Sequence, residues 1–358
     1  MQDKIKCGVI GAGWWATFAH IPALLSHPRA ELVAIQNDNP QQAQKIAQDF
    51  GVPHACVTAD ELLAIEGIEA IVVSSSPGLH YKNARAALTN GKHVLIEKPM
   101  TLTVAEATEL VKIADERNLR FLISCPWHYT AHAAEAQRLI RIGDLGQIRM
   151  ISVLMTNPIR DLLRGTDTQP THTSSAPYMQ PRPGTYSDPT MAGGGQIYTQ
   201  VCHAAAYLTF LTGAWPSEVF ARFHNDGAAL DIYDTLNLRM ADSSIVTIAS
   251  TGATSLERKD FEVRVFGTQG MLFLDLWRGK LDFFPLTGKP RTYPDLPEDA
   301  VYPHQAPARN MIDCISDPDH NQSPATLGVA AMQVIEGATR SATSGQNIFV
   351  STLMEHPA

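Results

Sequence analysis

Residues 5–16 read IKCGVIGAGWWA, and this stretch decides the fold of the first part of the chain. The run Lys4 to Ile10 predicts a buried strand, and a G-x-G-x-x-A pattern follows it directly where a helix begins. Gly11 allows a tight turn, Gly13 lets a pyrophosphate approach the backbone, and Ala16 lets the helix pack closely on the strand. The free N–H groups of the helix N-terminus attract phosphate. The stretch predicts a dinucleotide-binding site; the alternative is a glycine turn that serves packing alone.

Short apolar runs and helical patterns alternate downstream of this stretch. Four further runs predict strands at residues 31–36, 70–74, 93–96 and 120–124. Helical patterns lie between them at residues 40–50, 81–90 and 104–118. Strands and helices that alternate at this spacing form a parallel sheet with helices on both faces. We therefore expect a dinucleotide-binding Rossmann domain over residues 1–125.

The pattern changes after residue 125. Helical patterns lie at residues 131–142, 197–211, 306–316 and 328–344. Residues 147–155 predict a strand, and two hairpins pair 236–240 with 245–250 and 261–266 with 271–275. Residues 157–192 form a long irregular stretch rich in Pro, Thr, Ser and Gly, and loops of this length are usually functional. The fold class is α/β, in which a parallel Rossmann sheet precedes an α+β domain, residues 126–358, with a large, mostly antiparallel open sheet. The last helices are candidates to pack back on the Rossmann domain.

The composition of the 358 residues is typical of a globular protein, with 44% hydrophobic and 18% charged residues. The net charge of −8 argues against nucleic acid as a partner, because binding to phosphates requires a basic face. No run reaches the roughly 18 apolar residues of a membrane span, and we expect neither a membrane partner nor a signal peptide. The five cysteines form no C-x-x-C pair, which favours reduced thiols and a cytoplasmic location.

The second strand of the first domain ends at Gln36, and Asn37 and Asp38 follow it. An acidic residue at this place accepts hydrogen bonds from the hydroxyls of the adenosine ribose. No Arg or Lys follows Asp38 closely to hold a 2′-phosphate, so NAD is favoured over NADP as the cofactor. Alternatively, Asp38 serves only to cap the helix at 40–50, a position for which Asn39 competes.

The fourth strand ends in the sequence EKP at residues 97–99, which places a charged lysine at the edge of a parallel sheet where ligands bind. Together with GAGWWA at 11–16, and with GGG at 193–195 followed by His203, this motif resembles the Gfo/Idh/MocA oxidoreductase family (glucose-fructose oxidoreductase, inositol dehydrogenase and relatives). The resemblance extends over nearly the whole chain, including the hairpin-rich second half and the segment 336–341.

The resemblance implies a cleft between the two domains that holds nicotinamide and substrate. It also implies a second domain that binds substrate and whose sheet often forms the subunit interface, so we expect a homodimer or homotetramer. Lys98 matches the family lysine that contacts the reacting hydroxyl, His203 the histidine of the glycine-rich motif, and His80 a histidine close to the cofactor. The expected cofactor-binding residues are Gly11, Gly13, Trp14, Trp15, Asn37, Asp38, Ser75, His80, Glu97 and Lys98.

The chemistry of hydride transfer supports the same residues. Oxidation of a carbinol requires removal of the hydroxyl proton, for which His203 is the natural base, while Lys98 polarises and orients the oxygen. The chain departs from the family pattern four residues before His203, where Thr199 stands in place of Asp. A histidine without a carboxylate partner is less basic, so Tyr198 or Tyr186 is a candidate to share the proton chemistry. The expected catalytic residues are Lys98, His203, Tyr198 and Thr199.

The substrate is expected to contact several parts of the second domain. Trp127 is a candidate to stack on a sugar face or on the nicotinamide, with a packed core position as the alternative. Arginines of the 157–192 stretch suit an anionic group, and the alternative for each is a solvated loop residue. The expected substrate contacts are Lys98, Trp127, Tyr129, Arg160, Arg164, Tyr186, Asp188, Thr199 and His203, with His172 and Arg182 as further candidates.

One segment of the second domain has the spacing of metal ligands. His128 and His132 lie four residues apart with Glu135 three further on, a spacing that can bind a metal. No further motif completes the set of ligands, so we expect no metal.

Three functions are compatible with these residues. The leading one is an NAD-dependent oxidoreductase that transfers a hydride between a secondary hydroxyl carbon of a sugar, cyclitol or glycoside and nicotinamide. The second is a redox-neutral glycoside hydrolase that uses NAD for transient C3 oxidation, elimination and water addition, and it needs an extra acid or base such as Tyr186 or Tyr129. The third is a non-catalytic sugar or NAD sensor, which the presence of both Lys98 and His203 disfavours.

Overall fold

The first domain is built on a parallel sheet, as the alternating pattern predicts. The computed structural model describes residues 4–166, 177–182, 184–255 and 257–353. Six strands pair in the order β3-β2-β1-β4-β5-β6, all of them parallel. Their bounds are β1 (Ile5–Ile10), β2 (Ala30–Gln36), β3 (His54–Cys56), β4 (Ala70–Val73), β5 (His93–Ile96) and β6 (Phe121–Ile123). The sequence did not indicate β3, because this edge strand has only three residues and is partly exposed.

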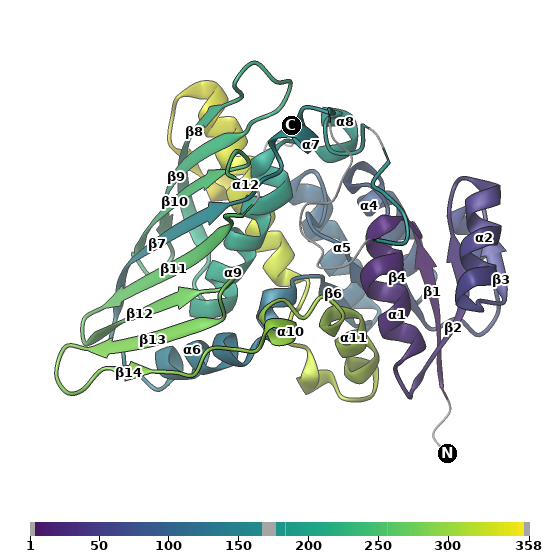
Figure 1. Cartoon of the computed structure of the whole chain (residues 1–358), viewed down its shortest axis with the longest axis horizontal. Helices are drawn as coiled ribbons and strands as arrows, with labels where there is room; N and C mark the ends of the chain where they lie inside the picture. The colour runs from purple at the N-terminus through teal and green to yellow at the C-terminus, as the bar shows by residue number, and fades with distance from the viewer. Residues whose placement is uncertain (1–3, 167–176, 183, 256, 354–358) are drawn as a thin grey trace.

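Helices cover both faces of this sheet (Figure 1). Their bounds are η1 (Ala16–His20), α1 (Ile21–Leu25), α2 (Pro40–Phe50), α3 (Ala59–Leu63), α4 (Pro77–Thr89) and α5 (Val104–Glu116). The expected helix at 81–90 begins earlier, at Pro77, because proline tolerates the first helical turn where its missing N–H would have no partner. Thr103 and Glu106 form a reciprocal capping box at the start of α5, which explains why this helix begins where the pattern predicts.

The second domain is built on a nine-stranded sheet in the order β14-β13-β12-β11-β7-β10-β9-β8-β15. Its strands are β7 (Ile148–Thr156), β8 (Pro216–His224), β9 (Tyr233–Met240), β10 (Ile245–Thr251), β11 (Asp260–Gly267), β12 (Gly270–Asp275), β13 (Lys280–Pro285), β14 (Arg291–Thr292) and β15 (Ile348–Phe349). Both expected hairpins are confirmed, since β9 pairs with β10 and β11 with β12 in antiparallel register. The pair β7–β10 alone is parallel among the pairs described, so the sheet is mixed.

Helices pack on one face of this sheet and leave the other face open (Figure 1). The longer ones are α6 (Ala131–Arg141), α9 (Cys202–Thr212), α11 (Ala306–Ser316) and α12 (Thr326–Ser344). The shorter helical segments are η2 (Pro126–Tyr129), α7 (Arg160–Leu163), α8 (Pro189–Ala192), η3 (Ile197–Val201), α10 (Glu298–Val301), η4 (Pro318–His320) and η5 (Val350–Leu353). Thus the described part of the stretch 157–192, expected to be irregular, contains the single-turn helices α7 and α8. The helix expected at 197–211 begins with the π-turn η3, a feature frequent at functional sites.

The last helices pack back on the first domain. Ala308, Met311 and Ile312 of α11 belong to the same buried cluster as residues of β1, β2 and α2. Helix α12 contacts α5 as well as α9 and β8. No helix among the described residues combines the length and apolarity that a membrane crossing requires. All five cysteines are free and buried.

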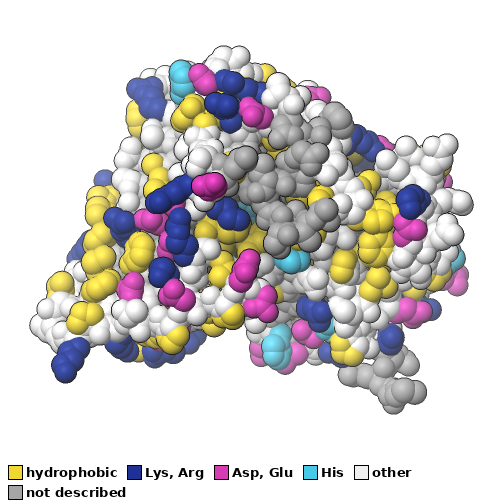
Figure 2. All heavy atoms as spheres, viewed as in Figure 1, with side chains coloured by type: hydrophobic (Ala, Val, Ile, Leu, Met, Phe, Trp, Pro, Cys, Tyr) yellow, Lys and Arg dark blue, Asp and Glu magenta, His cyan; other side chains and the backbone are white. Residues whose placement is uncertain are grey.

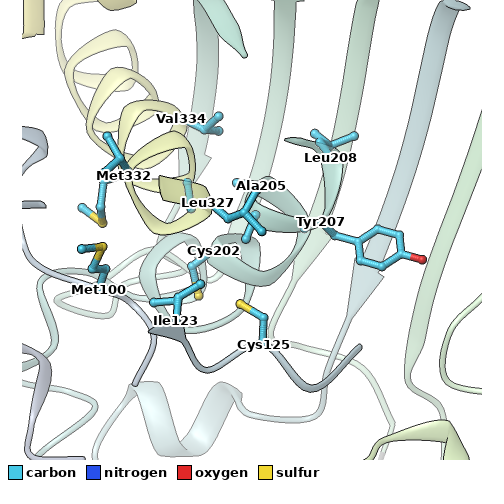
Figure 3. Close-up of a cluster of buried hydrophobic side chains, with 14 of the residues drawn as sticks. Met100, Ile123, Cys125, Cys202, Ala205, Tyr207, Leu208, Leu327, Met332 and Val334 are labelled. Atoms are coloured by element: carbon cyan, nitrogen blue, oxygen red, sulfur yellow. The ribbon is translucent and has the colours of Figure 1, made fainter. Parts of the chain in front are cut away.

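One hydrophobic core joins the two domains at the level of the EKP motif. Met100 and Cys125 from the first sheet's side pack in a single cluster with Cys202 of α9 and Met332 of α12. Figure 3 shows Met100 and Met332 pointing toward one another and Cys125 beside Cys202. Because dense packing resists displacement, the residues next to this cluster, Lys98 and His203 among them, are held in a fixed relation.

Candidate active site

A cleft of about 1780 Å3 lies between the two domains. Its first-domain wall is formed by the segments that follow β1, β2, β4 and β5, and its other wall by residues of η2, η3, α9 and α10 and by the segment before α8. Figure 2 shows hydrophobic, basic and acidic side chains mixed on the left of the visible face, over the large sheet. The cleft thus has the position that parallel α/β sheets give to ligand sites, at the carboxyl ends of the strands.

The glycine motif forms a turn that brings the backbone against the end of β4. Gly11 has φ +83°, and a Cβ atom there would lie 2.4 Å from the amide nitrogen of Ser75. A Cβ on Gly13 would meet only the carbonyl oxygen of Gly11, at 4.0 Å, so the space above Gly13 is open. A tight turn, an open backbone and a helix start together fit the pyrophosphate of a dinucleotide.

The ribose end of the cleft resolves the alternative left open for Asp38. The side chain of Asn39 accepts hydrogen bonds from the backbone N–H groups of Gln41 and Gln42, so Asn39 caps α2. Asn37 donates from Nδ2 to the carbonyl oxygen of Ala12, at 2.9 Å, and ties the second strand to the glycine turn. The carboxylate of Asp38 is therefore exposed in the cleft rather than occupied in capping.

A basic residue does reach Asp38, from far along the chain. Arg182 donates from both of its terminal nitrogens to the two carboxylate oxygens of Asp38, at 2.7 and 2.6 Å. The hydrogen bonds from Arg182 lower the pKa of Asp38. The sequence next to Asp38 contains no cation that follows it closely, as expected. Arg182 lies 144 residues further along the chain, so the local sequence does not indicate it.

Arg182 belongs to a segment that crosses from the second domain onto the first (residues 177–182 and 184–188; Figure 1), called here the crossing segment. Tyr178 at its start donates to Asp49 Oδ2 at 2.5 Å and stacks edge-on against Phe50. At its end, Tyr186 accepts a hydrogen bond from Trp14 Nε1 at 3.1 Å. The crossing segment thus contacts the first domain at the end of α2 and at the glycine motif.

The EKP motif is held by a buried network. Glu97 Oε1 lies 2.8 Å from both Trp15 Nε1 and His20 Nε2. Burial acts to raise the pKa of Glu97, but His20 and the nearby charge of Lys98 prevail and hold it at about 2. Glu97 is therefore ionised and fixes the EKP motif to the start of the first helix; a proton donor would need a higher pKa.

The two principal catalytic candidates line the same cleft. Lys98 donates from Nζ to the carbonyl oxygen of Thr199 in η3, at 3.0 Å. His203, in the first turn of α9, is 4% exposed, and its Nδ1 has no hydrogen-bond partner among the described residues. Burial, with the charges of Lys98 and His128, lowers the pKa of His203 well below its usual value. The imidazole is therefore neutral at neutral pH and able to accept a proton.

An aspartate that the sequence did not indicate positions this wall. Asp231 accepts hydrogen bonds from the backbone N–H groups of Gly195, at 2.8 Å, and Ile197, at 2.7 Å. A Cβ on Gly195 would lie 2.0 Å from the carbonyl oxygen of Asp231, so only glycine permits the approach. No local pattern marks Asp231 as a cap, because it lies 36 residues from the glycine whose N–H it accepts.

Most of the expected site residues are brought together at the cleft. These are Gly11, Gly13, Trp14, Trp15, Asn37, Asp38, Ser75, His80, Glu97, Lys98, Trp127, Tyr186, Thr199 and His203. His80 is only 1% exposed, and its two ring nitrogens lie 2.8 and 2.7 Å from the carbonyl oxygens of Pro99 and Ser75. These contacts tie the EKP motif to the end of β4, so His80 shapes the loops of the cofactor wall.

Two expected tyrosines do not line the cleft. Tyr198 is buried and donates to the carbonyl oxygen of Leu102 at 3.0 Å. Tyr129 donates to Asn310 Oδ1 in α11 at 3.2 Å. The Tyr198 bond joins η3 to the loop before α5, and the Tyr129 bond joins η2 to α11, so neither hydroxyl faces the cleft as the predicted roles in catalysis and substrate binding require.

Three charged candidates also lie outside the cleft lining. Arg160 pairs with Asp161, and Arg164 pairs with Asp226. Asp188 accepts from the backbone N–H of Thr190 and caps α8. Their charges are paired or used in capping outside the cleft lining, where the predicted substrate contacts would not reach them. His172 lies outside the described residues.

The histidine pair with metal-ligand spacing is not gathered around one point. His128 stacks on Phe210 with ring centroids 4.2 Å apart, and its Nδ1 lies 2.9 Å from Ser323 Oγ. The carboxylate of Glu135 accepts hydrogen bonds from Arg138 and Tyr293. Within the described part of the chain, no group of three or more His, Cys, Asp or Glu side chains could hold a metal ion.

An aromatic wall lines the substrate side of the cleft, and of its members only Trp127 was expected. Trp127 contacts Trp277 and Tyr302, with ring centroids 4.8 and 4.6 Å apart, and Trp277 contacts Tyr302 at 5.3 Å. Trp127 also meets His203 edge-on at 5.2 Å. Trp127 is 2% exposed and packs in the core, as its alternative predicts, so the partly buried Trp277 and Tyr302 are the rings that could meet the face of a sugar.

Two family models match the chain. The first, described as an oxidoreductase family with an NAD-binding Rossmann fold, matches residues 5–124, and the second, the GFO/IDH/MocA C-terminal domain, matches residues 133–273. An uncharacterised oxidoreductase of Synechocystis is 31% identical over 59% of this chain and 52% of its own length. A dTDP-3,4-didehydro-2,6-dideoxy-alpha-D-glucose 3-reductase of Streptomyces antibioticus is 32% identical over 44% of this chain and 48% of its own. The chain thus spans about half the length of these curated relatives.

Among solved structures, a levoglucosan dehydrogenase in complex with NADH and levoglucosan has the same fold. Its TM-score is 0.79 at 17% identity, with 97% of this chain and 100% of that chain covered. At this identity the likeness concerns the fold, in which a Rossmann domain is followed by a domain with a large open sheet.

Proposed function

Because the chain belongs to the Gfo/Idh/MocA family of oxidoreductases, we propose that it transfers a hydride between a secondary hydroxyl carbon of a sugar, cyclitol or glycoside and nicotinamide. One observation carries the proposal: the ammonium of Lys98 and the imidazole of His203 line the same cleft as the glycine turn. The reductase and the dehydrogenase found by comparison are named for sugar substrates, which supports a carbohydrate as the substrate class.

The cofactor wall fits NAD. Gly11 and Gly13 would receive the pyrophosphate, and Asn37 and Asp38 the adenosine ribose. NAD, when bound, supplies the hydride acceptor. Each oxygen of Asp38 accepts one hydrogen bond from Arg182 and has a lone pair left for a ribose hydroxyl, and the carboxylate would oppose a 2′-phosphate, which supports NAD over NADP.

The remaining chemistry falls to this chain's own side chains. Lys98 would donate a hydrogen bond to the oxygen of the substrate hydroxyl. This bond would orient the hydroxyl so that the carbon that bears it can lose a hydride. His203, neutral because burial lowers its pKa, would accept the hydroxyl proton. Thr199 contributes through its backbone, whose carbonyl orients the ammonium of Lys98. The same lowering of the pKa makes His203 a weaker base, in keeping with the missing carboxylate four residues before it.

The tyrosines considered as the extra acid or base of the redox-neutral alternative have other partners among the described residues. Burial raises the pKa of Tyr186 to about 12, and its hydroxyl is engaged by Trp14. Tyr129 and Tyr198 face other partners. These contacts favour net hydride transfer over glycoside hydrolysis.

The open face of the second sheet supports self-association. Met150 and Ile245, neighbours in the β7–β10 pair, are 37% and 49% exposed, and Leu154 further along β7 is 38% exposed. Exposed apolar groups in one patch commonly mark an interface. We propose a homodimer or homotetramer through this face, which sedimentation equilibrium of the purified chain would measure.

The proposed function is tested by mixing the protein with NAD+ and a panel of sugars, sugar acids, cyclitols and aryl glycosides, and by recording absorbance at 340 nm. Growth of NADH with one class of substrate is the expected result, and the same assay with Lys98→Met is the control. Release of an aglycone without net NADH would replace the proposal with the redox-neutral hydrolase.

A further inference from the structure

The ammonium of Lys259 lies on the substrate side of the cleft, just before β11. Its Nζ is 3.7 Å from the centroid of the Trp277 ring, and the side chain is half-buried. Within the described part of the chain it has no ion pair and no hydrogen bond to a carboxylate. Burial lowers the pKa of Lys259, in keeping with a cation that has lost water without gaining a counter-charge.

Neighbouring cations are neutralised locally, which sets Lys259 apart. Arg258 and Arg278 both lie near the carboxylate of Asp260, at 3.5 and 3.1 Å. The aromatic face of Trp277 offsets part of the cost of holding an ammonium away from water, but a ring does not replace an anion. The site is therefore incomplete until an anion enters the cleft.

A continuous set of rings connects Lys259 to the reacting groups. Trp277, which carries the ammonium on its face, meets Trp127, and Trp127 meets His203. The indole N–H of Trp127 is buried and has no hydrogen-bond partner among the described residues. A sugar ring on this wall, with its reacting hydroxyl at Lys98, would extend its other end toward Lys259.

Two acidic residues, Glu298 and Asp299, line the same cleft as Lys259. Both are exposed at the start of α10, where water screens their charge, and neither pairs with Lys259. The half-buried ammonium of Lys259 is screened less than these two exposed carboxylates.

We propose that the substrate carries an anionic substituent, a carboxylate or a phosphate, and that Lys259 binds it on the Trp277 face while Lys98 and His203 act on the hydroxyl. This specificity rests on the proposed hydride transfer and names the class of sugar that the site takes. An ammonium and an anion form a charge-assisted hydrogen bond, which is stronger than one between neutral groups.

The test uses matched neutral and anionic substrates with two variants. Lys259→Met keeps the apolar stem and removes the charge, whereas Lys289→Met removes an exposed charge outside the cleft lining and serves as the control. The substrates are glucose with glucuronate and glucose 6-phosphate, galactose with galacturonate, and inositol with inositol phosphate. We expect Lys259→Met to lower kcat/KM for the anionic member about 30-fold more than for the neutral member, mainly through KM.

The outcomes separate the inference from the proposed function. If neutral and anionic sugars are used equally and Lys259→Met affects both alike, the inference is wrong and the proposed function stands. If only acids or only phosphates respond, the anion is identified. If no sugar yields NADH, the proposed function fails, and calorimetric binding of glucuronate and glucose 6-phosphate to the NAD-saturated protein then decides: weaker binding by Lys259→Met than by Lys289→Met supports the inference, and equal binding overturns it.

Discussion

The two walls of the cleft are built in different ways. On the cofactor wall, the glycine turn, Asp38, Ser75 and the EKP motif each follow a strand of one parallel sheet. On the substrate wall, Trp127, His203, Lys259, Trp277 and Tyr302 come from separate helices, strand ends and loops. The first wall is a property of a sheet edge, where the carboxyl ends of parallel strands meet. The second exists only because the core that contains Met100, Cys202 and Met332 packs both domains together.

This difference predicts which mutations affect one wall and leave the other unchanged. A change in a strand-end motif should affect cofactor binding or chemistry locally, whereas a change in the support of η3 and α9 should act on the substrate wall from a distance. The following predictions test that separation, from the largest expected effect to the smallest.

Lys98 stands where the walls meet, so its loss should abolish chemistry without removing the cofactor. We expect Lys98→Met to lower kcat about 1000-fold, because a preorganised cation at the reacting oxygen is lost, while the Kd for NAD stays within about threefold. Stopped-flow absorbance and fluorescence titration measure the two quantities, and Lys112→Met, an exposed lysine of α5, is the control. A collapse of NAD affinity with normal turnover at saturation would contradict the role of Lys98.

Glu97 should make the cofactor wall sensitive to acid. Its pKa of about 2 in the folded protein lies below its usual 4.5, so its stabilisation is complete above pH 4.5 and is lost as the pH falls from 4.5 toward 2. The loss should amount to about 3 kcal/mol in the free energy of unfolding. Urea unfolding across this pH range measures it, and Glu97→Gln should lack that part of the slope. Equal slopes in both proteins would show that Glu97 is not held ionised.

Asp38 and Arg182 test whether the crossing segment takes part in cofactor choice. Without the carboxylate, the guanidinium of Arg182 is free to bind a 2′-phosphate, so Asp38→Ala should shift the ratio of kcat/KM for NAD over NADP by about 100-fold toward NADP. Steady-state assays with both cofactors measure the ratio. The double variant with Arg182→Ala should lose the gain with NADP; if it keeps the gain, Arg182 does not reach the phosphate.

Asp231 tests the support of the substrate wall. Asp231→Ala removes two hydrogen bonds to backbone N–H groups and should cost about 1–2 kcal/mol in the free energy of unfolding. Because η3 carries Thr199, kcat/KM should also fall about tenfold. Asp242→Ala removes a carboxylate that accepts a hydrogen bond from the backbone N–H of Ser244 in the β9–β10 turn. This variant should lower the free energy of unfolding by a similar amount and leave kcat/KM unchanged. Equal activity in both variants would break the proposed link between Asp231 and the reacting groups.

The two walls also differ in how far the sequence predicts them. The strands and the cofactor residues were predictable because their signals lie within a few residues of each other, as at 11–16 and 97–99. Arg182, Asp231 and Trp277 were not predicted as partners of the site, since each acts across tens of residues or more. Arg160 and Arg164 had the right chemistry for substrate, but nearby aspartates neutralise both.

The sequence by itself determined the Rossmann fold, the family resemblance and the cofactor wall, because hydrophobic periodicity and short motifs specify strands and the turns at their ends. Tertiary structure alone decided which tyrosines face the cleft, which cations remain without a counter-charge, and how Arg182 meets Asp38. The physical reason is that burial and pairing depend on all the elements packed around a side chain, and those contacts join residues that are distant in the chain.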